Sequence, residues 1–396
     1  MTAITVVGGV YSERCTWPDW DMIFGSGARA AAALSSLVDA VELVAYATPE
    51  TTKRFQDYAS LYGFRFSPHS ARRAISFDYL HSMSVPVIRP AYGTIAQNAP
   101  LSVKGDVVLR FGMLEGTAMV NAEVCIYDPQ DAFSPQVFHA NGSSARRLAI
   151  VANAGEIAAL SGDRDRATGA RALLAKSNAE VVVVKAGLDG ALVVTHDAIT
   201  AVPAFKTTST FTIGSGDVFA AVFGALWGVE GRDPVAAARL ASIAVAEYVE
   251  DRNLPVRPVK ALEAAQRDPL KASRDRVYLA GPFFTMAQLW LIDEAKRCLT
   301  DLGMDVFSPF HQIGPGPAEE VGPADIEALK ECEAVFAVLD GLDSGTIFEV
   351  GFARAIGKPV VGFSQTVPEE DLKMIAGSDC MVISDFVSAL VAVAAR

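Results

Sequence analysis

Three carboxylates in the last third of the sequence have the types and spacing needed to act on one bond. Asp325 is predicted to open a helix, whereas Asp343 and Glu349 follow a predicted strand that ends at Leu339. In open parallel sheets, ligands bind at the carboxyl ends of the strands. Cleavage of an N-glycosidic bond needs paired carboxylates, because one attacks or stabilises the oxocarbenium-like carbon and another protonates the departing base. Each residue also has an ordinary interpretation: a helix cap for Asp325, a turn for Asp343 and a first-turn acid for Glu349.

A second candidate site, TIGSGD at 212–217, precedes an apolar helix predicted over 218–226. Its glycines let backbone N–H groups converge on an anion at the helix N-terminus. Asp217 would then accept a proton from an attacking hydroxyl group. The alternative interpretation is a plain tight turn.

The elements that must position these residues alternate between strand-like and helix-like stretches. In the first part of the chain, strands are predicted over 6–7, 41–45, 107–110, 124–127, 181–185 and 191–195, and helices over 28–37 and 236–250. The last two strands flank LDG at 188–190, whose Asp-Gly pair predicts a hairpin. This alternation indicates α/β layers around a mostly parallel sheet.

A polar stretch, QRDPLKASRDR at 266–276, predicts a linker between a domain over 1–265 and a domain over 277–396. A fresh alternation follows it, with strands predicted over 277–280, 305–307, 335–339, 359–363 and 381–383. The helices between and after them are predicted over 287–302, 324–332, 347–356 and from 385 onward, with Pro323 at the start of the second. Five such strands are typical of a small flavodoxin-like, doubly wound domain.

The composition excludes several classes of protein. The chain has 396 residues, and its 51% hydrophobic and 20% charged residues indicate a globular protein. Its longest apolar run, at 219–229, is far shorter than the roughly 20 residues of a membrane span, and a formal charge of −12 disfavours a nucleic-acid polymer as partner. The five cysteines form no C-x-x-C pair, so we expect reduced thiols. The N-terminus lacks a signal-peptide pattern, so we expect a cytoplasmic protein.

Residues 276–395 resemble the nucleoside 2-deoxyribosyltransferases. The resemblance rests on VYLAGPFF at 277–284, DI at 325–326 and DSGTIFEVGFA at 343–353. It implies that Glu349 is the nucleophile, that Asp343 orients and activates it, and that Asp325 donates a proton to the base. Tyr278 would hold the nucleophile through its hydroxyl group. The other expected substrate-binding residues are Gly281, Pro282, Phe283 and His311. Related nucleotide N-hydrolases share the fold and use water as the acceptor.

The expected position of Glu349 in the first helical turn favours its ionised form, because N–H groups and the helix dipole stabilise negative charge there. Asp343 nearby would raise the pKa of one member of the pair. We therefore expect Tyr278 to donate a hydrogen bond that keeps Glu349 charged, as a nucleophile must be. Asp325 must then be protonated, at least transiently.

Residues 1–265 resemble the ribokinase-like (PfkB) carbohydrate and nucleoside kinases. The resemblance rests on FGSGARA at 24–30, DPQ at 128–130, NAGE at 153–156, KAGLDG at 185–190 and the turn at 212–217. It implies a three-layer α/β/α domain that uses ATP and Mg²⁺, with Asp217 as the base. The residues implied for nucleotide and Mg²⁺ are Gly214, Ser215, Gly216, Asn153, Glu156, Lys185, Gly187 and Gly190, with Glu156 tied to the metal. Gly25 and Gly27 would face the sugar.

Three features depart from the kinase pattern. Phe211 stands where an Asp usually helps with the sugar or a monovalent cation, and Arg29 stands where an Asn is usual. Only about 15 residues separate Val10 from Gly25, too few for the usual β-sheet lid over the sugar, so 11–21 is expected to form a shorter wall.

Together, these features predict a bifunctional enzyme of nucleoside or nucleotide metabolism. Its C-terminal domain would cleave or exchange an N-glycosidic bond, and its N-terminal domain would transfer phosphate from ATP to a sugar or nucleoside hydroxyl. The alternative is a nucleotide N-glycoside hydrolase with a degenerate, regulatory nucleotide-binding domain. The expected partners are small nucleoside, nucleotide and sugar substrates, with no membrane, and a homo-oligomer is expected because neighbouring chains complete the pockets of the transferases.

Overall fold

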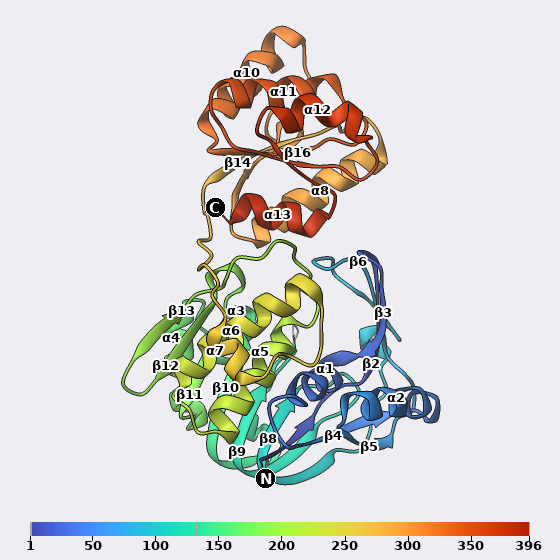
Figure 1. Ribbon diagram of the computed structural model, residues 1–396, viewed down its shortest axis with the longest axis vertical. Helices are drawn as coiled ribbons and strands as arrows, with labels where there is room; N and C mark the ends of the chain where they lie inside the picture. Colours follow the sequence, from blue (N-terminus) through green and yellow to red (C-terminus); the bar gives the residue numbers. More distant parts are fainter. Residues whose placement is uncertain (1, 132–133, 396) are drawn as a thin grey trace. The chain divides into compact units, whose positions relative to one another are not determined.

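The computed structural model describes residues 2–131 and 134–395, which form two compact units (Figure 1). Unit 1 takes Met1–Thr207 and Phe211–Pro269, and unit 2 takes Thr208–Thr210 and Leu270–Arg396. The division falls within the polar stretch 266–276. Its first part is held in unit 1, where the Lys206 N–H donates to the carbonyl of Asp268 at 2.9 Å. Its later part is held in unit 2, where the Ser273 N–H donates to the carbonyl of Ala394 at 2.7 Å.

Unit 1 is built on a nine-stranded sheet whose central strands are apolar on both faces, as strands covered by helices on both sides must be. Val181 and Val183 pack into one core, whereas Val182 and Val184 pack into the other. The strand order is β13-β12-β11-β10-β9-β8-β1-β4-β5, parallel except at the β11–β12 and β12–β13 pairs. The strands are β1 (Ala3–Val7), β4 (Ala40–Ala47), β5 (Arg65–Ser70), β8 (Leu101–Phe111), β9 (Ala118–Asp128), β10 (Ser144–Asn153), β11 (Val181–Lys185), β12 (Ala191–Thr195) and β13 (Ile199–Val202).

Helices cover both faces of this sheet and complete the predicted three layers. One core includes residues of α1 (Gly25–Leu34), α2 (Pro49–Tyr62), α5 (Ser215–Phe223), α6 (Pro234–Asp251) and α7 (Val259–Ala264). The other includes residues of α3 (Ala154–Ser161) and α4 (Arg166–Ser177). The long apolar run at 219–229 is α5 with the π-helical turn that continues it, Gly224–Val229.

A second, four-stranded sheet in unit 1 overturns the expectation of a shortened wall. Its order is β3-β2-β6-β7, from β2 (Tyr11–Trp17), β3 (Trp20–Phe24), β6 (Ser76–His81) and β7 (Val87–Arg89). The hairpin β2–β3 is short, as predicted, but β6 pairs with β2 in parallel and extends the sheet. The prediction failed because half of the sheet comes from a segment far along the chain.

Unit 2 has an all-parallel sheet in the order β15-β14-β16-β17-β18. Its strands are β14 (Arg276–Ala280), β15 (Asp305–Phe307), β16 (Ala334–Val338), β17 (Val360–Phe363) and β18 (Met381–Ile383). One face carries α10 (Ala318–Glu331), α11 (Ser344–Ala355) and α12 (Glu369–Gly377), and the other carries α8 (Met286–Asp301) and α13 (Phe386–Ala394) (Figure 1). A short helix, α9 (Pro309–Gln312), follows β15. The predicted fold class is confirmed in both units.

Candidate active sites

In unit 2, the predicted hydrogen bond between Tyr278 and Glu349 is present. The Tyr278 hydroxyl, at the middle of β14, donates to Glu349 Oε1 on α11 at 2.6 Å. Tyr278 is fully buried and its ring stacks on Phe307 of the neighbouring strand, with 5.5 Å between the ring centroids. Packing therefore fixes the tyrosine, and the tyrosine fixes one oxygen of the carboxylate.

Glu349 does not lie in the first turn of its helix, as the sequence had suggested. The Asp343 side chain accepts hydrogen bonds from the Thr346 N–H at 2.9 Å and from the Thr346 hydroxyl at 3.1 Å, so α11 begins at Ser344. Glu349 is consequently the sixth residue of the helix and lies beyond its free N–H groups. Asp343 acts here as an N-cap.

The environment of Glu349 opposes its charge instead of favouring it. The pKa of Glu349 is raised to about 7, chiefly by burial and also by the negative charges of Asp325 and Asp343, while the Tyr278 hydrogen bond lowers it. Burial and the charge of Glu349 together raise the pKa of Tyr278, which therefore stays a hydrogen-bond donor. The expectation of a carboxylate stabilised by the helix dipole is wrong, because Glu349 is too far from the helix end.

Asp325 lies inside α10 and does not open it. The helix begins at Ala318 and includes Pro323, so the prediction of a helix start at this proline is wrong; the helix continues with one backbone donor fewer. Asp325 Oδ1 is buried and, among the described residues, has no hydrogen-bond partner. Burial raises the pKa of Asp325. A half-buried carboxylic acid held near Glu349 can carry the proton that a departing base needs.

The expected substrate-binding residues of unit 2 follow β14 and β15. The rings of Phe283 and Phe310 lie 5.3 Å apart. A Cβ on Gly281 would lie 2.6 Å from Ile292 Cδ1, so this glycine serves packing, and Pro282 is buried. Both ring nitrogens of His311 are engaged, Nδ1 with Ser308 Oγ and Nε2 with Asp293 Oδ1, each at 2.9 Å. His311 is thus held by the protein, and its role in base recognition stays a prediction.

In unit 1, both oxygens of Asp217 are engaged by side chains of the chain itself. Arg29 Nη1 donates to Asp217 Oδ2 at 2.6 Å, and the Gln130 side-chain amide donates to Asp217 Oδ1. Asp217 is the third residue of α5, after the left-handed Gly214 (φ 81°). Gln130 follows β9, so the contact joins the carboxyl end of the sheet to the turn at 212–217.

Arg29 lies at the centre of a buried ionic network. Its side chain is 1% exposed and also forms an ion pair with Glu13 of β2, while its Nε donates to the Tyr248 hydroxyl at 3.0 Å. Burial would lower the pKa of Arg29, but the charges of Glu13, Tyr248 and Asp217 outweigh burial and raise it. Glu13 Oε1 accepts from the Gly25 N–H at 3.0 Å, which ties the start of α1 to the second sheet.

Among the remaining expected ligands of ATP and Mg²⁺, Lys185 and Glu156 form a second cluster of charges with Asp128, whereas Asn153 is exposed. Lys185, at the end of β11, forms an ion pair with Asp128, and a Cβ on Gly216 would lie 3.3 Å from Lys185 Nζ. Burial raises the pKa of Asp128 to about 7, against the opposing charge of Lys185. Asn153 and Glu156 form a capping box at the start of α3, and burial raises the pKa of Glu156.

This cluster has the donor set that a magnesium ion prefers. Asp128 Oδ1 is buried and, in the described part of the chain, lacks a hydrogen-bond partner. Magnesium binds carboxylate oxygens in such sites. Asp128 and Glu156 are therefore the residues that fit the metal.

The other glycines predicted to face ligands have structural explanations. Gly190 ends the predicted hairpin between β11 and β12, where a Cβ would lie 2.1 Å from the carbonyl oxygen of Val202. Gly187 opens the short turn before it. Gly27 packs against the end of β1, because a Cβ there would lie 2.7 Å from the Gly8 backbone.

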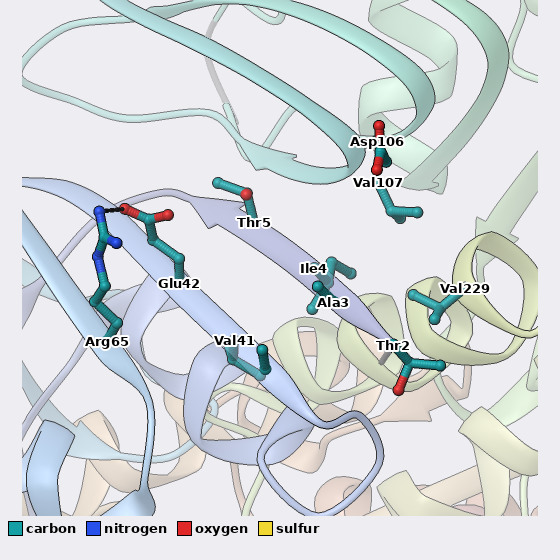
Figure 2. A pocket seen from close by; sticks show the side chains of 11 residues that line it. Thr2, Ala3, Ile4, Thr5, Val41, Glu42, Arg65, Asp106, Val107 and Val229 are labelled. Atoms are coloured by element: carbon teal, nitrogen blue, oxygen red, sulfur yellow. Dashed lines mark ion pairs between the residues drawn. The ribbon is translucent and has the colours of Figure 1, made fainter.

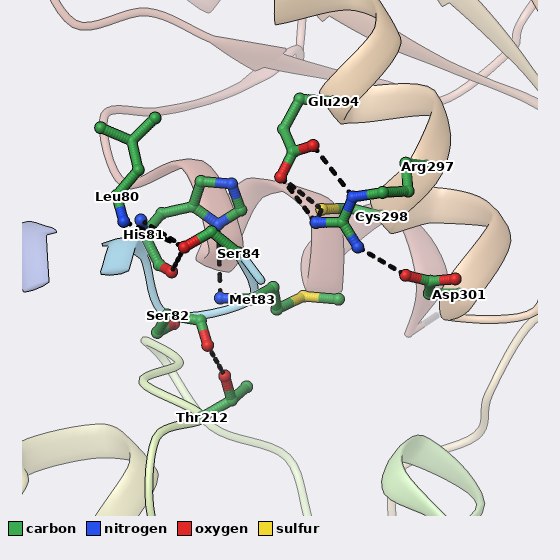
Figure 3. Close-up of polar contacts among 10 residues, drawn as sticks. All are labelled: Leu80, His81, Ser82, Met83, Ser84, Thr212, Glu294, Arg297, Cys298 and Asp301. Atoms are coloured by element: carbon green, nitrogen blue, oxygen red, sulfur yellow. Dashed lines mark hydrogen bonds and ion pairs between the residues drawn. The ribbon is translucent and has the colours of Figure 1, made fainter. Parts of the chain in front are cut away.

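The second sheet is anchored beside the turn at 212–217. The Thr212 hydroxyl donates to the carbonyl of Ser82, which follows β6, at 2.6 Å (Figure 3). Phe211 packs with Cys15 and Ile213 in a small core and lies 5.2 Å from the ring of Trp20. At the position where an Asp is usual, the chain therefore has a packing residue.

A cavity of about 480 Å³ opens at the opposite edge of the large sheet, where β1, β4 and β5 begin (Figure 2). Its lining includes Thr5, Asp106 and the ion pair of Glu42 with Arg65 at 2.9 Å. None of the residues predicted for the kinase-like site lines it.

Sequence reasoning missed Glu13 and Tyr248 and gave no role to Gln130. Glu13 lies on a strand with no catalytic motif, and Tyr248 lies in an apolar helix, so neither carried a signal. Asp128 was noted only as part of a strand end, which was a usable signal for a ligand position.

Two further features concern the cysteines and the helices. None of the five cysteines is in a disulfide. Among the residues that the structure describes, no helix has both the length and the apolarity to cross a membrane.

Comparison with known proteins supports both resemblances. Residues 277–375 match the family model for nucleoside 2-deoxyribosyltransferase, and residues 129–254 match that for pfkB family carbohydrate kinase. An uncharacterized protein of Schizosaccharomyces pombe is 30% identical over an alignment of 103 residues that covers 22% of this chain and 49% of that protein. The chain thus spans about half the length of this curated relative.

Several solved structures are similar to about two thirds of the chain. A ribokinase from Thermotoga maritima is 18% identical, with 67% of this chain and 99% of that chain covered and a TM-score of 0.48. A fructokinase from Vibrio cholerae O395 is 16% identical, with 67% and 98% covered and a TM-score of 0.49. At these values the neighbours say nothing of substrate or reaction. The chain joins a segment matched by the pfkB carbohydrate kinase model to one matched by the nucleoside 2-deoxyribosyltransferase model, and both predicted resemblances are confirmed.

Proposed function

We propose that unit 2 cleaves or exchanges the N-glycosidic bond of a nucleoside or nucleotide, with Glu349 as the nucleophile. The observation that carries this proposal is the Tyr278–Glu349 hydrogen bond in a buried setting where the pKa of Glu349 is about 7. A carboxylate that is poised near neutral pH, and is not tied to a cation, can attack the sugar carbon and later leave it.

The reaction would proceed in two steps. An oxygen of Glu349 bonds to the anomeric carbon as the bond to the base nitrogen breaks, and Asp325 gives its proton to the departing base. A second base or a water molecule then attacks the same carbon, the bond to Glu349 breaks, and Asp325 recovers a proton. The buried, unpartnered Asp325 Oδ1 and the raised pKa of Asp325 support its role as the acid.

The acceptor decides between two outcomes, a transferase and a hydrolase. Incubation of the protein with a panel of nucleosides and nucleotides, with and without a second free base, tests both by mass spectrometry. An exchanged nucleoside indicates a transferase, and free sugar alone indicates a hydrolase. If the protein releases no base from any member of the panel, the proposal is wrong.

Unit 1 is matched by a kinase family model, and its first candidate function is phosphate transfer from ATP to a sugar or nucleoside hydroxyl. In this proposal, the turn from Gly214 to Gly216 and Lys185 hold phosphate groups, and Asp217 takes the hydroxyl proton. Asp128 and Glu156 would hold Mg²⁺, which neutralises phosphate charge when bound. The tether between units would raise the local concentration of a shared intermediate.

One observation favours a second candidate, a nucleotide-binding unit that transfers no phosphate and regulates the glycosidic reaction. The proposed base, Asp217, is paired with the buried Arg29. Incubation of the nucleoside panel with Mg-ATP separates the candidates, because only a kinase makes a phosphorylated product.

We also propose that the protein is a homo-oligomer. A monomer in light scattering at micromolar concentration would refute this part of the proposal.

A further inference from the structure

We infer that Arg29 occupies the acceptor side of the kinase-like site, which is the side of the turn at 212–217 where a substrate hydroxyl would lie. It thereby keeps Asp217 from that hydroxyl, so unit 1 in this form holds nucleotide without transferring phosphate. This inference rests on the proposed placement of nucleotide at Gly214–Gly216. It assigns a positioning role to Arg29, together with its partner Glu13.

The first step concerns the carboxylate. A base must accept a proton from the attacking hydroxyl while the oxygen of that hydroxyl bonds to phosphorus and the bond between phosphorus and ADP breaks. In this structure Asp217 Oδ2 accepts from Arg29 at 2.6 Å and Oδ1 accepts from Gln130. A hydroxyl would have to displace one of these donors before it could reach the carboxylate.

The second step concerns Arg29, whose side chain could move away from Asp217 only by breaking its other hydrogen bonds. Its three nitrogens each have a partner: Nε the Tyr248 hydroxyl, Nη1 Asp217 and Nη2 Glu13. The Tyr248 hydroxyl in turn donates to the carbonyl of Ile213, in the turn itself, at 3.0 Å. The guanidinium thus connects β2, α1, α5 and α6 around one buried charge.

The third step concerns Gly214, which the sequence assigned to an anion hole. A Cβ built on Gly214 would lie 2.1 Å from Arg29 Nε and 2.3 Å from Arg29 Cδ and Cζ. A glycine here leaves room for the guanidinium of Arg29. Gly216, by contrast, faces Lys185, so the donor side of the turn keeps its own cation. The guanidinium of Arg29 therefore fills the acceptor side, whereas Lys185 lies beside Gly216 on the donor side, where the nucleotide would bind.

The test replaces the internal cation and its partner together. Glu13→Gln/Arg29→Asn removes both charges, so no buried carboxylate of Glu13 is left without a counter-charge. Phosphate transfer from Mg-ATP is measured to water and to D-ribose, 2-deoxy-D-ribose, D-fructose, adenosine and inosine. Binding of Mg-ATP is measured by calorimetry in the same samples. Arg110→Asn is the matched control, because Arg110 is also buried but hydrogen-bonds to Phe138, Ser143 and their neighbours.

We expect the wild type to bind Mg-ATP and to transfer phosphate no faster than Asp217→Asn. The double variant should transfer at least about tenfold faster, within the roughly 10²–10⁴-fold range of a general base, and Asp217→Asn added to it should remove the gain. Arg110→Asn should show no gain. A gain on substitution cannot come from a merely structural role, because loss of structure lowers activity.

Two results would overturn the inference. One is Asp217-dependent phosphate transfer by the wild type; the kinase candidate would then stand and the restraining role of Arg29 would fall. The other is a folded, ATP-binding double variant that transfers no faster than its Asp217→Asn derivative. If the double variant does not fold, Arg29→Gln, whose uncharged amide is still a hydrogen-bond donor, replaces it under the same criteria. The wild-type arm decides alone if neither variant folds. Base release at Glu349, measured in parallel, reports separately on unit 2.

Discussion

The two candidate carboxylates of this chain have opposite partners. Asp217 of unit 1 is paired with the guanidinium of Arg29, whereas Glu349 of unit 2 accepts a hydrogen bond from the uncharged hydroxyl of Tyr278. Both lie on a helix that follows a turn, Asp217 as the third residue of α5 and Glu349 as the sixth residue of α11. An ion pair occupies an oxygen of Asp217, whereas burial without a cation leaves Glu349 with a pKa of about 7, poised between two protonation states. Position on the fold thus made both residues candidates, and their partners set them apart.

The largest expected effect is the loss of glycosidic activity in Glu349→Ala. If Glu349 forms the covalent intermediate, base release should fall by on the order of 10⁴-fold or more. Chromatography of released base measures it. Glu320→Ala, at an exposed acid on α10, is the control and should keep its activity. If Glu349→Ala and wild type released base at comparable rates, Glu349 would not be a catalytic carboxylate, and its comparison with Asp217 would have no basis.

Asp325→Asn should reduce base release by about 10²–10⁴-fold, because an amide cannot protonate the departing base. The reduction should be much smaller for a nucleoside whose base leaves without protonation. Rates for a good and a poor leaving base in the same variant measure this difference. Equal losses for both would show that Asp325 is not the acid.

The buried ion pair of Asp217 predicts a larger loss of stability on substitution than an exposed ion pair does. Asp217→Asn leaves a buried guanidinium with one carboxylate fewer, which should cost about 3–5 kcal/mol of unfolding free energy. Asp21→Asn, in the exposed pair of Arg14 with Asp21, should cost about 0–1 kcal/mol. Urea unfolding of each variant measures both.

For Glu349 the sign depends on pH. Its folded-state pKa is raised from 4.5 to about 7, so its contribution to stability is fully present below pH 4.5 and is lost as pH rises through about 7. Glu349→Gln does not ionise and escapes this loss. The stability of the variant relative to wild type should therefore increase from pH 5 to pH 8. A relative stability that falls over this range would contradict the raised pKa.

The smallest effects are opposite shifts in the pH dependence of base release. The wild-type rate should rise with pH up to about 7, as Glu349 ionises. The Tyr278 hydrogen bond lowers the pKa of Glu349, so Tyr278→Phe should move the rise upward by about one pH unit. The charge of Asp343 raises it, so Asp343→Asn should move the rise downward, and Asn keeps the helix cap. Shifts in the same direction would refute this assignment of causes.

The fold was largely predictable, because the alternation of β-branched runs with helical stretches in the sequence marks most strands of the two large sheets and the helices between them. The failures have two causes: strand pairing between segments that are distant in the sequence, and misplaced helix starts. The second sheet of unit 1 depends on the pairing of β2 with β6, which no local pattern shows. The starts of α10 and α11 were misplaced because Pro323 is tolerated inside a helix and Asp343 supplies a cap.

In the candidate sites, only the residues that belong to recognisable sequence motifs could be predicted. The Tyr278–Glu349 contact was implied by the resemblance to the transferases and expected from the charges of the carboxylates, and it is present. The Arg29–Asp217 pair spans 188 residues of sequence, and an arginine in an Ala-rich helix gives no sign of its partner. The protonation behaviour of Glu349 depends on burial, which appears only once the helix and sheet are packed.

The most direct test of the central claim is to trap the glycosyl intermediate. A 2-fluoro-2-deoxy nucleoside analogue slows breakdown of a covalent sugar ester, because fluorine destabilises the oxocarbenium-like transition state. After incubation of the wild type, peptide mass spectrometry should find the fluorinated sugar on Glu349, and Glu349→Ala should stay unlabelled. A sugar on another residue, or equal labelling of Glu349→Ala, would contradict the account.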